Sequence, residues 1–256
     1  MRIAIIIPAR LESTRLPNKM LLPETGIPLI CHTAEAAAAI MARRPDVFVR
    51  VLVAADHSDV AEAVERFARE RSLGIEPVLT RTDHQSGSDR IAEAAERLPS
   101  DIDAILNIQG DEPDLPPENV LDLAAFAERE EADIHTLVYP VDSRGDRENP
   151  ALVKAILGEG GRALYFSRAD VPFRRADGPW ALPSYGHVGI YLYRREALRR
   201  FVSLSQGVLE RTEKLEQLRA LENGMTIRAL VLASRPPKGI DTRDDYDDFV
   251  RRRRQA

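Results

Sequence analysis

Apolar residues occur in short, mostly β-branched runs that alternate along the chain with longer stretches of helical spacing. Such runs predict buried strands. The expected strands are, in chain order, Ile3–Ile7, Val49–Ala54, Pro77–Leu79, Ala104–Ile108, Ile134–Tyr139, Val153–Leu157, Val188–Tyr193 and Thr226–Leu232. The expected helices are Leu29–Ala42, Ser58–Glu70, Gly87–Leu98, Pro117–Glu130, Arg194–Ser203 and Gly207–Asn223. This alternation predicts an α/β fold in which helices flank a mostly parallel, mixed sheet.

A chain of 256 residues is long enough to bury a large core, and it shows neither an internal repeat nor a low-complexity linker. We therefore expect one domain over residues 1–256. The least regular insert is Ala176–Tyr185, which is rich in Pro and Gly. The cationic run Arg251–Arg254 is expected to fray in solvent.

Composition and charge exclude several functional classes. The formal net charge of -5 argues against nonspecific binding of nucleic acid, which needs a basic face. The sequence shows neither a secretory leader nor a membrane span, so we expect a cytoplasmic protein with no membrane partner. Cys31 is the one cysteine, which excludes an internal disulfide framework and a cysteine-rich zinc site. Its expected role is packing within a helix.

Three cations follow the first expected strand, at Arg10, Arg15 and Lys19. The carboxyl ends of parallel strands are where open α/β sheets bind ligands. Arginine forks and a lysine point charge would suit a polyphosphate, although the loop lacks the glycines of the common phosphate-binding motifs. Taken alone, the same cations could equally be the solubilising residues of a surface loop.

Two acidic residues also follow predicted strands. Asp111 lies in N-I-Q-G-D-E-P after Ala104–Ile108, and Asp241 lies in K-G-I-D-T after the last strand. Because Mg²⁺ prefers few carboxylates together with phosphate oxygens, these two could suffice as its ligands. The alternatives are an ordinary surface turn for Asp111 and a helix N-cap for Asp241.

Two further regions carry polar groups that would suit a ligand. Arg81, Ser86 and Gly87 stand at a helix entrance suited to a nucleotide base and ribose, although such an entrance needs no ligand. His187 and Tyr191 are four residues apart on one strand, so they share a face that would suit a sugar acid.

A glutamate-rich helix follows in the C-terminal half of the chain. Glu210 and Lys214 would form an i,i+4 pair on a solvated face of this helix. The interpretation as residues of a solvated helix face is weaker for Glu216 and Gln217.

Taken in order, seven motifs resemble those of the 3-deoxy-manno-octulosonate (Kdo) cytidylyltransferases from Ile3 to about Phe249. They are P-A-R-x-x-S-T-R-L-P-x-K, T-R-x-D-H-Q-S-G-S-D-R, N-I-Q-G-D-E-P, A-L-Y-F-S-R, H-V-G-I-Y, E-K-L-E-Q-L-R and G-I-D-T. The resemblance implies a Rossmann-like nucleotide-diphospho-sugar transferase fold, with a sugar-binding and dimerisation portion around residues 160–225. It also implies a homodimer that uses Mg²⁺ and CTP to activate Kdo for lipopolysaccharide synthesis.

The resemblance also implies roles for individual residues. Those implied to contact the nucleotide are Ala9, Arg10, Arg15, Lys19, Arg81, Ser86, Gly87 and Gln109. Those implied to be catalytic are Arg15, Lys19, Asp111 and Asp241, of which the two aspartates resemble the Mg²⁺ ligands. Those implied to bind the sugar are Arg168, His187, Tyr191, Glu216 and Gln217.

This chain departs from the family pattern at three positions. Asn18 replaces a glycine, Gly186 replaces a basic residue and Arg243 replaces a proline. An alternative function is therefore the same chemistry on 8-amino-Kdo or another acidic sugar. A metal-dependent glycosyltransferase is disfavoured because Asp101-Ile102-Asp103 precedes its strand, and a non-catalytic nucleotide-binding module would need neither Asp111 nor Asp241.

Overall fold

The computed structural model describes residues 1–13, 15–173, 175 and 184–255, and its chain separates into two compact units. Unit 1 comprises residues 1–121 and 236–256, and unit 2 comprises residues 122–235. Most of the irregular insert expected at Ala176–Tyr185 lies outside the described residues. Within the described part of the chain, no helix is both long and apolar enough to span a bilayer.

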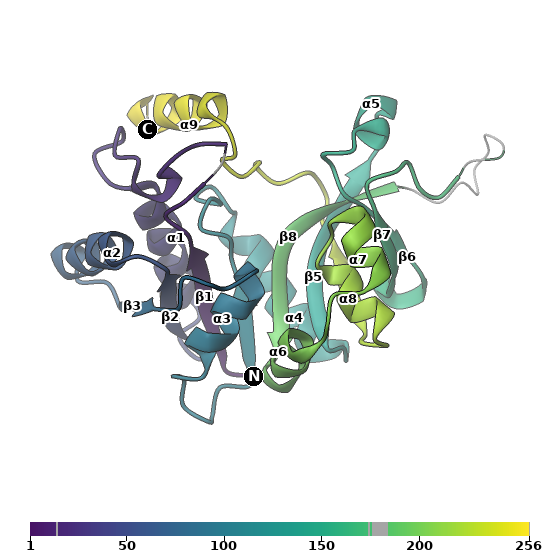
Figure 1. Ribbon diagram of the computed structural model, residues 1–256, viewed down its shortest axis with the longest axis horizontal. Helices are drawn as coiled ribbons and strands as arrows, with labels where there is room; N and C mark the ends of the chain where they lie inside the picture. The colour runs from purple at the N-terminus through teal and green to yellow at the C-terminus, as the bar shows by residue number, and fades with distance from the viewer. Residues whose placement is uncertain (14, 174, 176–183, 256) are drawn as a thin grey trace. The chain divides into compact units, whose positions relative to one another are not determined.

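Unit 1 contains a parallel sheet in the order β3-β2-β1-β4 (Figure 1). The strands are β1 (Ile3–Ala9), β2 (Phe48–Ala55), β3 (Ile75–Leu79) and β4 (Ala104–Asn107). Every residue of β1 is buried, as its continuous β-branched run predicts for a strand covered on both faces.

Helices follow the strands of unit 1 where hydrophobic spacing predicts them. They are α1 (Leu29–Arg43), α2 (Ser58–Arg71) and α3 (Gly87–Ala95), with a 3-10 turn, η1, at Lys19–Leu21. A fourth helix, α4 (Pro117–Arg129), begins in unit 1 and ends in unit 2. Cys31 is buried in α1, which confirms its expected packing role. The α/β class is confirmed.

The strand order reverses direction beside β1. The chain runs from β1 outward to β2 and β3, and then crosses to β4 on the other side of β1. Right-handed crossovers therefore place α3 on the face of the sheet opposite α1 and α2. The carboxyl ends of β1 and β4 flank the switch point, where open sheets of this kind bind ligands.

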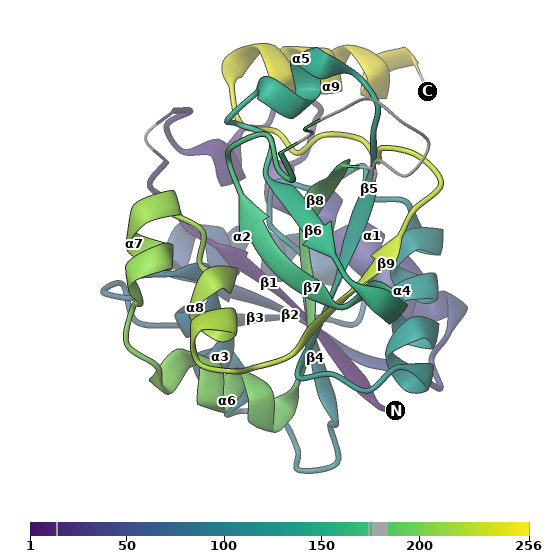
Figure 2. The same cartoon turned by 90° about the vertical axis from the view of Figure 1, so that its right-hand side faces the viewer.

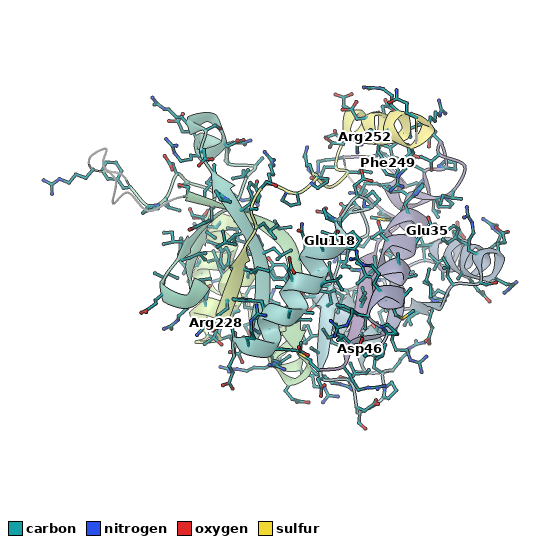
Figure 3. The ribbon with its side chains drawn as sticks, turned by 180° about the vertical axis from the view of Figure 1, so that it is seen from behind. Glu35, Asp46, Glu118, Arg228, Phe249 and Arg252 are labelled. Atoms are coloured by element: carbon teal, nitrogen blue, oxygen red, sulfur yellow. The ribbon has the colours of Figure 1, made fainter. Side chains whose placement is uncertain are left out.

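Helix α9 (Arg243–Gln255) completes unit 1 and corrects two expectations (Figure 3). Its N-cap is Thr242, whose hydroxyl accepts the Asp245 N–H at 3.2 Å while the Asp245 carboxylate accepts the Thr242 N–H at 2.9 Å. The N-cap alternative for Asp241 is therefore wrong. The run Arg251–Arg254 is also helical rather than frayed, because Arg252 and Arg253 both form ion pairs with Asp114.

Apolar packing joins α9 to the rest of unit 1. Tyr246, Phe249 and Val250 form a buried cluster with Leu16, Leu29 and Ile240. Leu16 lies in the cationic loop (residues 10–19), and Ile240 immediately precedes Asp241. The cluster thus fixes two segments that carry candidate site residues.

Unit 2 contains a mixed group of strands. They are β5 (Ile134–Val141), β6 (Lys154–Leu157), β7 (Ala163–Ser167), β8 (Ser184–Arg194) and β9 (Ile227–Val231). The pair β5–β9 is parallel, whereas β5–β8, β6–β8 and β6–β7 are antiparallel; Figure 2 shows β6 beside β7. The helical elements are α5 (Arg144–Glu148), η2 (Glu159–Gly161), α6 (Arg195–Ser203), α7 (Val208–Glu213) and α8 (Gln217–Glu222).

The helix expected over Gly207–Asn223 is wrong as a single element. Lys214 adopts a left-handed conformation with φ of 55°, which ends α7 and separates it from α8. The break also rules out the expected Glu210–Lys214 pair. Glu210 instead forms a buried bidentate ion pair with Arg219, with N–O distances of 2.6 and 2.8 Å.

Candidate active site

Two loops meet at the switch point of unit 1, the cationic loop after β1 and the loop after β4 that carries Asp111. Gly110 makes this approach possible. A Cβ atom at Gly110 would lie 2.9 Å from the Pro8 carbonyl oxygen and 3.1 Å from the Met20 Sδ. A side chain there would collide with the main chain at the end of β1 and crowd η1, so this glycine is required by packing.

The four predicted catalytic residues lie together at this point. The Lys19 ammonium is 2.5 Å from Asp111 Oδ2 and 3.7 Å from Asp241 Oδ1, and it donates to the Ile240 carbonyl at 2.9 Å. Arg15 donates to Asp241 Oδ1 at 2.8 Å. Lys19 is only 6% exposed, whereas the Arg15 side chain is 65% exposed. The buried Lys19 ammonium thus lies between two carboxylates, and the long side chain of Arg15 places a second positive charge at the solvent-exposed edge of the site.

Glu112 adds a third carboxyl group that the sequence analysis did not select. Burial and the neighbouring charges of Asp111 and Asp241 raise the pKa of Glu112 to about 8. The protonated form can therefore donate a hydrogen bond at neutral pH, whereas a carboxylate only accepts. The one feature of the sequence that could have indicated a role for Glu112 is its position next to Asp111 in N-I-Q-G-D-E-P.

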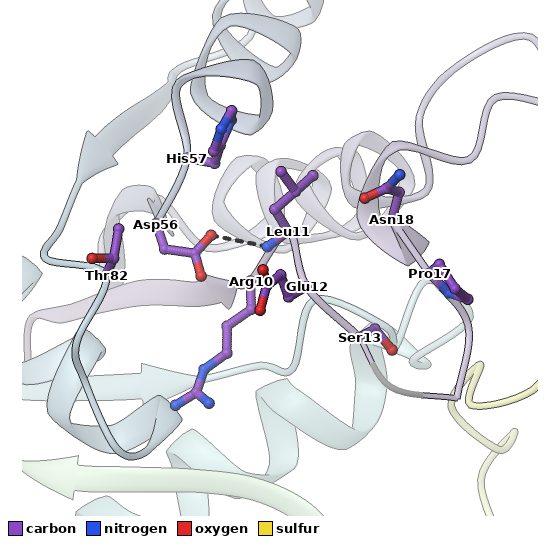
Figure 4. Close-up of a pocket in the computed structure, with 9 residues that line it drawn as sticks. All are labelled: Arg10, Leu11, Glu12, Ser13, Pro17, Asn18, Asp56, His57 and Thr82. Atoms are coloured by element: carbon purple, nitrogen blue, oxygen red, sulfur yellow. Dashed lines mark hydrogen bonds between the residues drawn. The ribbon is translucent and has the colours of Figure 1, made fainter.

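Beside these charges, a cavity of about 750 Å³ opens along the cationic loop (Figure 4). It is lined by Arg10, Leu11, Glu12, Ser13, Pro17, Asn18, Asp56, His57 and Thr82. The Leu11 N–H donates to Asp56 Oδ1 at 2.9 Å, so the end of β2 holds the start of the loop. Asp56 was also missed by sequence reasoning, since a single acid after a strand resembles a turn residue.

The predicted base and ribose contacts lie in the loop after β3 and at the start of α3, and they are not among the residues that line this cavity. Arg10 donates to the His84 carbonyl at 3.3 Å, and the Arg81 N–H donates to Glu93 at 3.2 Å. Ser86 caps α3, with its hydroxyl accepting the Asp89 N–H at 3.1 Å. This capping box confirms the expected helix start at Gly87.

The remaining two nucleotide candidates also lie in unit 1. Ala9 is buried at the end of β1, and the Gln109 side chain donates to the Asn107 side-chain oxygen at 3.1 Å. Unit 1 thus holds every residue predicted to contact the nucleotide. Their nucleotide-binding roles stay predictions.

In unit 2, His187 and Tyr191 share one face of β8, as the strand period predicts, and a shift in the β5–β8 register between Val188 and Tyr191 brings the two rings close together. Their ring centroids are 5.3 Å apart, and the His187 Nε2 lies 3.0 Å from the Thr136 hydroxyl. Burial lowers the pKa of His187 to about 3. The imidazole is therefore neutral at neutral pH, so one ring nitrogen can donate a hydrogen bond and the other can accept one.

Arg168 follows β7 in unit 2 and is already held by main-chain groups. Its Nε donates to the Glu213 carbonyl at 2.8 Å, and one terminal nitrogen donates to the Pro150 carbonyl at 3.0 Å. The Glu213 carboxylate accepts the Arg168 N–H at 3.0 Å and the Ser167 hydroxyl at 2.7 Å. These contacts fix the end of β7 against the break between α7 and α8. Gln217, at the start of α8, is buried, and Glu216 immediately precedes it.

Two departures from the family pattern preserve the local backbone. Asn18 has φ of 53° and ψ of 30°, the left-handed region that glycine favours and asparagine tolerates. Arg243 occupies the first position of α9, where proline is favoured, and it forms ion pairs with Glu24 and Asp247. At both positions the backbone conformation is therefore one that the family residue and the residue of this chain can adopt.

The third departure, Gly186, lies on the face of β8 opposite His187, because successive strand residues alternate. It pairs with Tyr139 across β5 and β8, and a Cβ atom there would overlap the Tyr139 ring. The Arg235 guanidinium lies 5.6 Å from the centre of the same ring. The missing basic side chain therefore does not alter the face that carries His187 and Tyr191.

The comparisons with known proteins agree with this geometry. Residues 4–227 match the family model described as cytidylyltransferase. A 3-deoxy-manno-octulosonate cytidylyltransferase from Paramagnetospirillum magneticum is 43% identical over 250 residues, covering 95% of this chain and 94% of that protein. The chain belongs to the cytidylyltransferase family. The resemblance to Kdo cytidylyltransferases found in the sequence is thereby confirmed.

Solved structures extend the match to the fold. A CMP:2-keto-3-deoxy-manno-octonic acid synthetase complexed with CTP superposes with a TM-score of 0.88 at 33% identity, covering 100% of this chain and 99% of that one. The inositol-1-phosphate CTP transferase from T. maritima gives a TM-score of 0.65 at 17% identity, covering 100% and 97%. The second match supports the fold alone.

The left-handed conformation of Asn18 predicts opposite effects for two substitutions. Asn18→Gly should leave the melting temperature and the affinity for CTP close to those of the wild type. Asn18→Val should cost about 1–2 kcal/mol of backbone strain, because a β-branched residue is disfavoured there, and should weaken CTP binding. Calorimetric titration with CTP and thermal unfolding of both variants would test this. Equal behaviour of the two variants would contradict it.

Proposed function

We propose that this protein transfers CMP from CTP to 3-deoxy-D-manno-octulosonate, giving CMP-Kdo and pyrophosphate for lipopolysaccharide biosynthesis. The observation that carries the proposal is the convergence of Arg15, Lys19, Asp111 and Asp241 at the switch point of a nucleotide-binding type of sheet. The extensive identity to a Kdo cytidylyltransferase supports the same substrates.

The reaction is a displacement at the α-phosphorus of CTP. The anomeric hydroxyl oxygen of the sugar forms a bond to this phosphorus and loses its proton, while the bond to the β-phosphate oxygen breaks and pyrophosphate leaves. Such a transfer depends mainly on positioning and charge stabilisation. Arg15 and Lys19 supply positive charge for the phosphates, and their placement after β1 suits the departing pyrophosphate.

The donor set at the switch point fits Mg²⁺. Asp111 and Asp241 both approach a single cationic group, the Lys19 ammonium, so their oxygens can serve one cation together. Two carboxylates complemented by phosphate oxygens and water suit this ion. Mg²⁺ held there would neutralise phosphate charge and favour ionisation of the attacking hydroxyl.

In this proposal, residues of unit 2 bind the sugar. Neutral His187 and the Tyr191 hydroxyl can exchange hydrogen bonds with sugar hydroxyls, and Gln217 offers both a donor and an acceptor. Glu216 and Arg168 complete the set, with Arg168 also bracing the α7–α8 break. A homodimer is part of the proposal and follows from the family resemblance, and the cytoplasmic location expected from the sequence is part of it as well.

A pyrophosphate-release assay with a panel of substrates tests the proposed function. We expect release with CTP and Kdo and much less with UTP or ATP. Faster release with 8-amino-Kdo than with Kdo would replace the proposed sugar. The absence of release with every sugar acid and every nucleotide would contradict the assignment.

Replacement of either proposed metal ligand should alter the Mg²⁺ requirement. Asp111→Asn and Asp241→Asn keep the side-chain size but weaken the oxygen donor, so turnover should fall on the order of 10²-fold at limiting Mg²⁺. Steady-state rates measured across a Mg²⁺ titration would check this. Asp244→Asn, an exposed position on α9, is the matched control. An unchanged Mg²⁺ dependence in either variant would remove that residue from the ligand set.

Gln217→Ala should separate sugar binding from nucleotide binding. Loss of a hydrogen bond worth about 0.5–1.5 kcal/mol should raise the KM for Kdo several-fold, while the calorimetric Kd for CTP stays near the wild-type value. Gln206→Ala, at an exposed site before α7, serves as the control. Weaker CTP binding with an unchanged KM for Kdo would overturn the role of Gln217.

A further inference from the structure

Arg90, on α3, is a completely buried cation that the proposed chemistry does not use. Its side chain is 0% exposed. One terminal nitrogen donates to the Thr80 hydroxyl at 2.6 Å and to the Arg81 carbonyl at 3.2 Å, and the other lies 3.5 Å from Asp56 Oδ2. These partners come from the segments that follow β2 and β3.

The contacts of Arg90 extend indirectly to the cationic loop. Asp56 receives the Arg90 guanidinium on Oδ2 and the Leu11 N–H on Oδ1. Figure 4 shows Asp56 and Leu11 joined at the wall of the cavity. One side chain on α3 therefore links the segments at the carboxyl ends of three neighbouring strands, β1, β2 and β3.

Burying this arginine has a large desolvation cost, which packing alone would not explain. Removing a guanidinium from water costs several kcal/mol, and Asp56 is its single carboxylate neighbour within 4 Å among the described residues. Within that part of the chain, Arg90 Nε also has no hydrogen-bond partner. A buried polar group kept under these conditions calls for an explanation beyond stability.

The same helix holds the loop after β3 at a second place. Glu93 accepts the Arg81 N–H and forms a short hydrogen bond with the His84 imidazole. Arg10, a predicted nucleotide contact, donates in turn to the His84 carbonyl. Helix α3 thus positions the segment Arg81–Ser86 through Arg90 near its middle and Glu93 in its last turn.

We propose that Arg90 is a positioning residue for CTP, which sets the spacing between the cationic loop and the loop after β3 without touching the substrate. The inference rests on the proposed function, because it takes the cavity beside Arg10 as the nucleotide site. In this proposal Arg90 affects the binding of CTP and not the binding of the sugar. A residue that only stabilised unit 1 would change the melting temperature and leave the affinity of the folded protein for CTP unaltered.

Arg90→Lys tests this role because it retains the charge but loses the planar fork that reaches three partners. We expect the Kd for CTP, measured calorimetrically well below the melting temperature, to rise roughly tenfold or more. The KM for Kdo at saturating CTP should stay within about twofold of the wild-type value. Arg97→Lys is the matched control, since Arg97 donates to the Leu79 carbonyl at the end of β3, beside the segment that Arg90 holds, but is exposed.

Two milder variants keep the test informative if Arg90→Lys does not fold. Thr80→Val removes one acceptor and Asp56→Asn weakens another, and each should raise the Kd for CTP. Combined with Arg90→Lys, or with each other if that variant is unfolded, their effects should be less than additive, because they interrupt one network.

Lower stability with unchanged CTP affinity in every folded variant would overturn the role of Arg90. Failure of the wild-type protein to bind CTP would instead contradict the proposed function itself. The two failures are therefore distinguished by the wild-type titration.

Discussion

The ammonium group of Lys19 is the interaction on which the catalytic end of unit 1 depends. It is buried, and its contacts come from the loop after β4 and from the segment that precedes α9. A buried cation is stable only where several oxygens surround it. Lys19 therefore holds three distant parts of the chain at one point, and the close approach allowed by Gly110 makes this possible.

The parts of the structure that are set by local pattern could be predicted from the sequence. The β-branched run of β1, the cations after it and the placement of Asp111 after β4 follow from periodicity and from the rule for strand ends. The α3 N-terminus follows from its capping residues. In these cases the residues that decide the structure lie within a few positions of one another.

The rest depends on partners that are distant in the sequence. Glu112 acquires its raised pKa from burial and from the charge of Asp241, and Arg90 finds Asp56 across 34 positions. The break at Lys214 was missed because its left-handed conformation is stabilised by contacts of neighbouring residues with Arg168 rather than by a glycine. No local pattern reports such contacts, so sequence reasoning misses most of the groups that position the site.

The long separation between Arg15 and Asp241 also bears on how the protein is made. These residues are 226 positions apart, and Leu16 packs against residues of α9. Contacts of such long range form late in folding, since the loop between them must be closed first. During synthesis the cationic loop emerges early, yet its packing surface and one of its carboxylates emerge only with the segment that leads into α9. The catalytic end of unit 1 is therefore assembled after translation has passed this segment, and a nascent chain cannot hold a finished site before then.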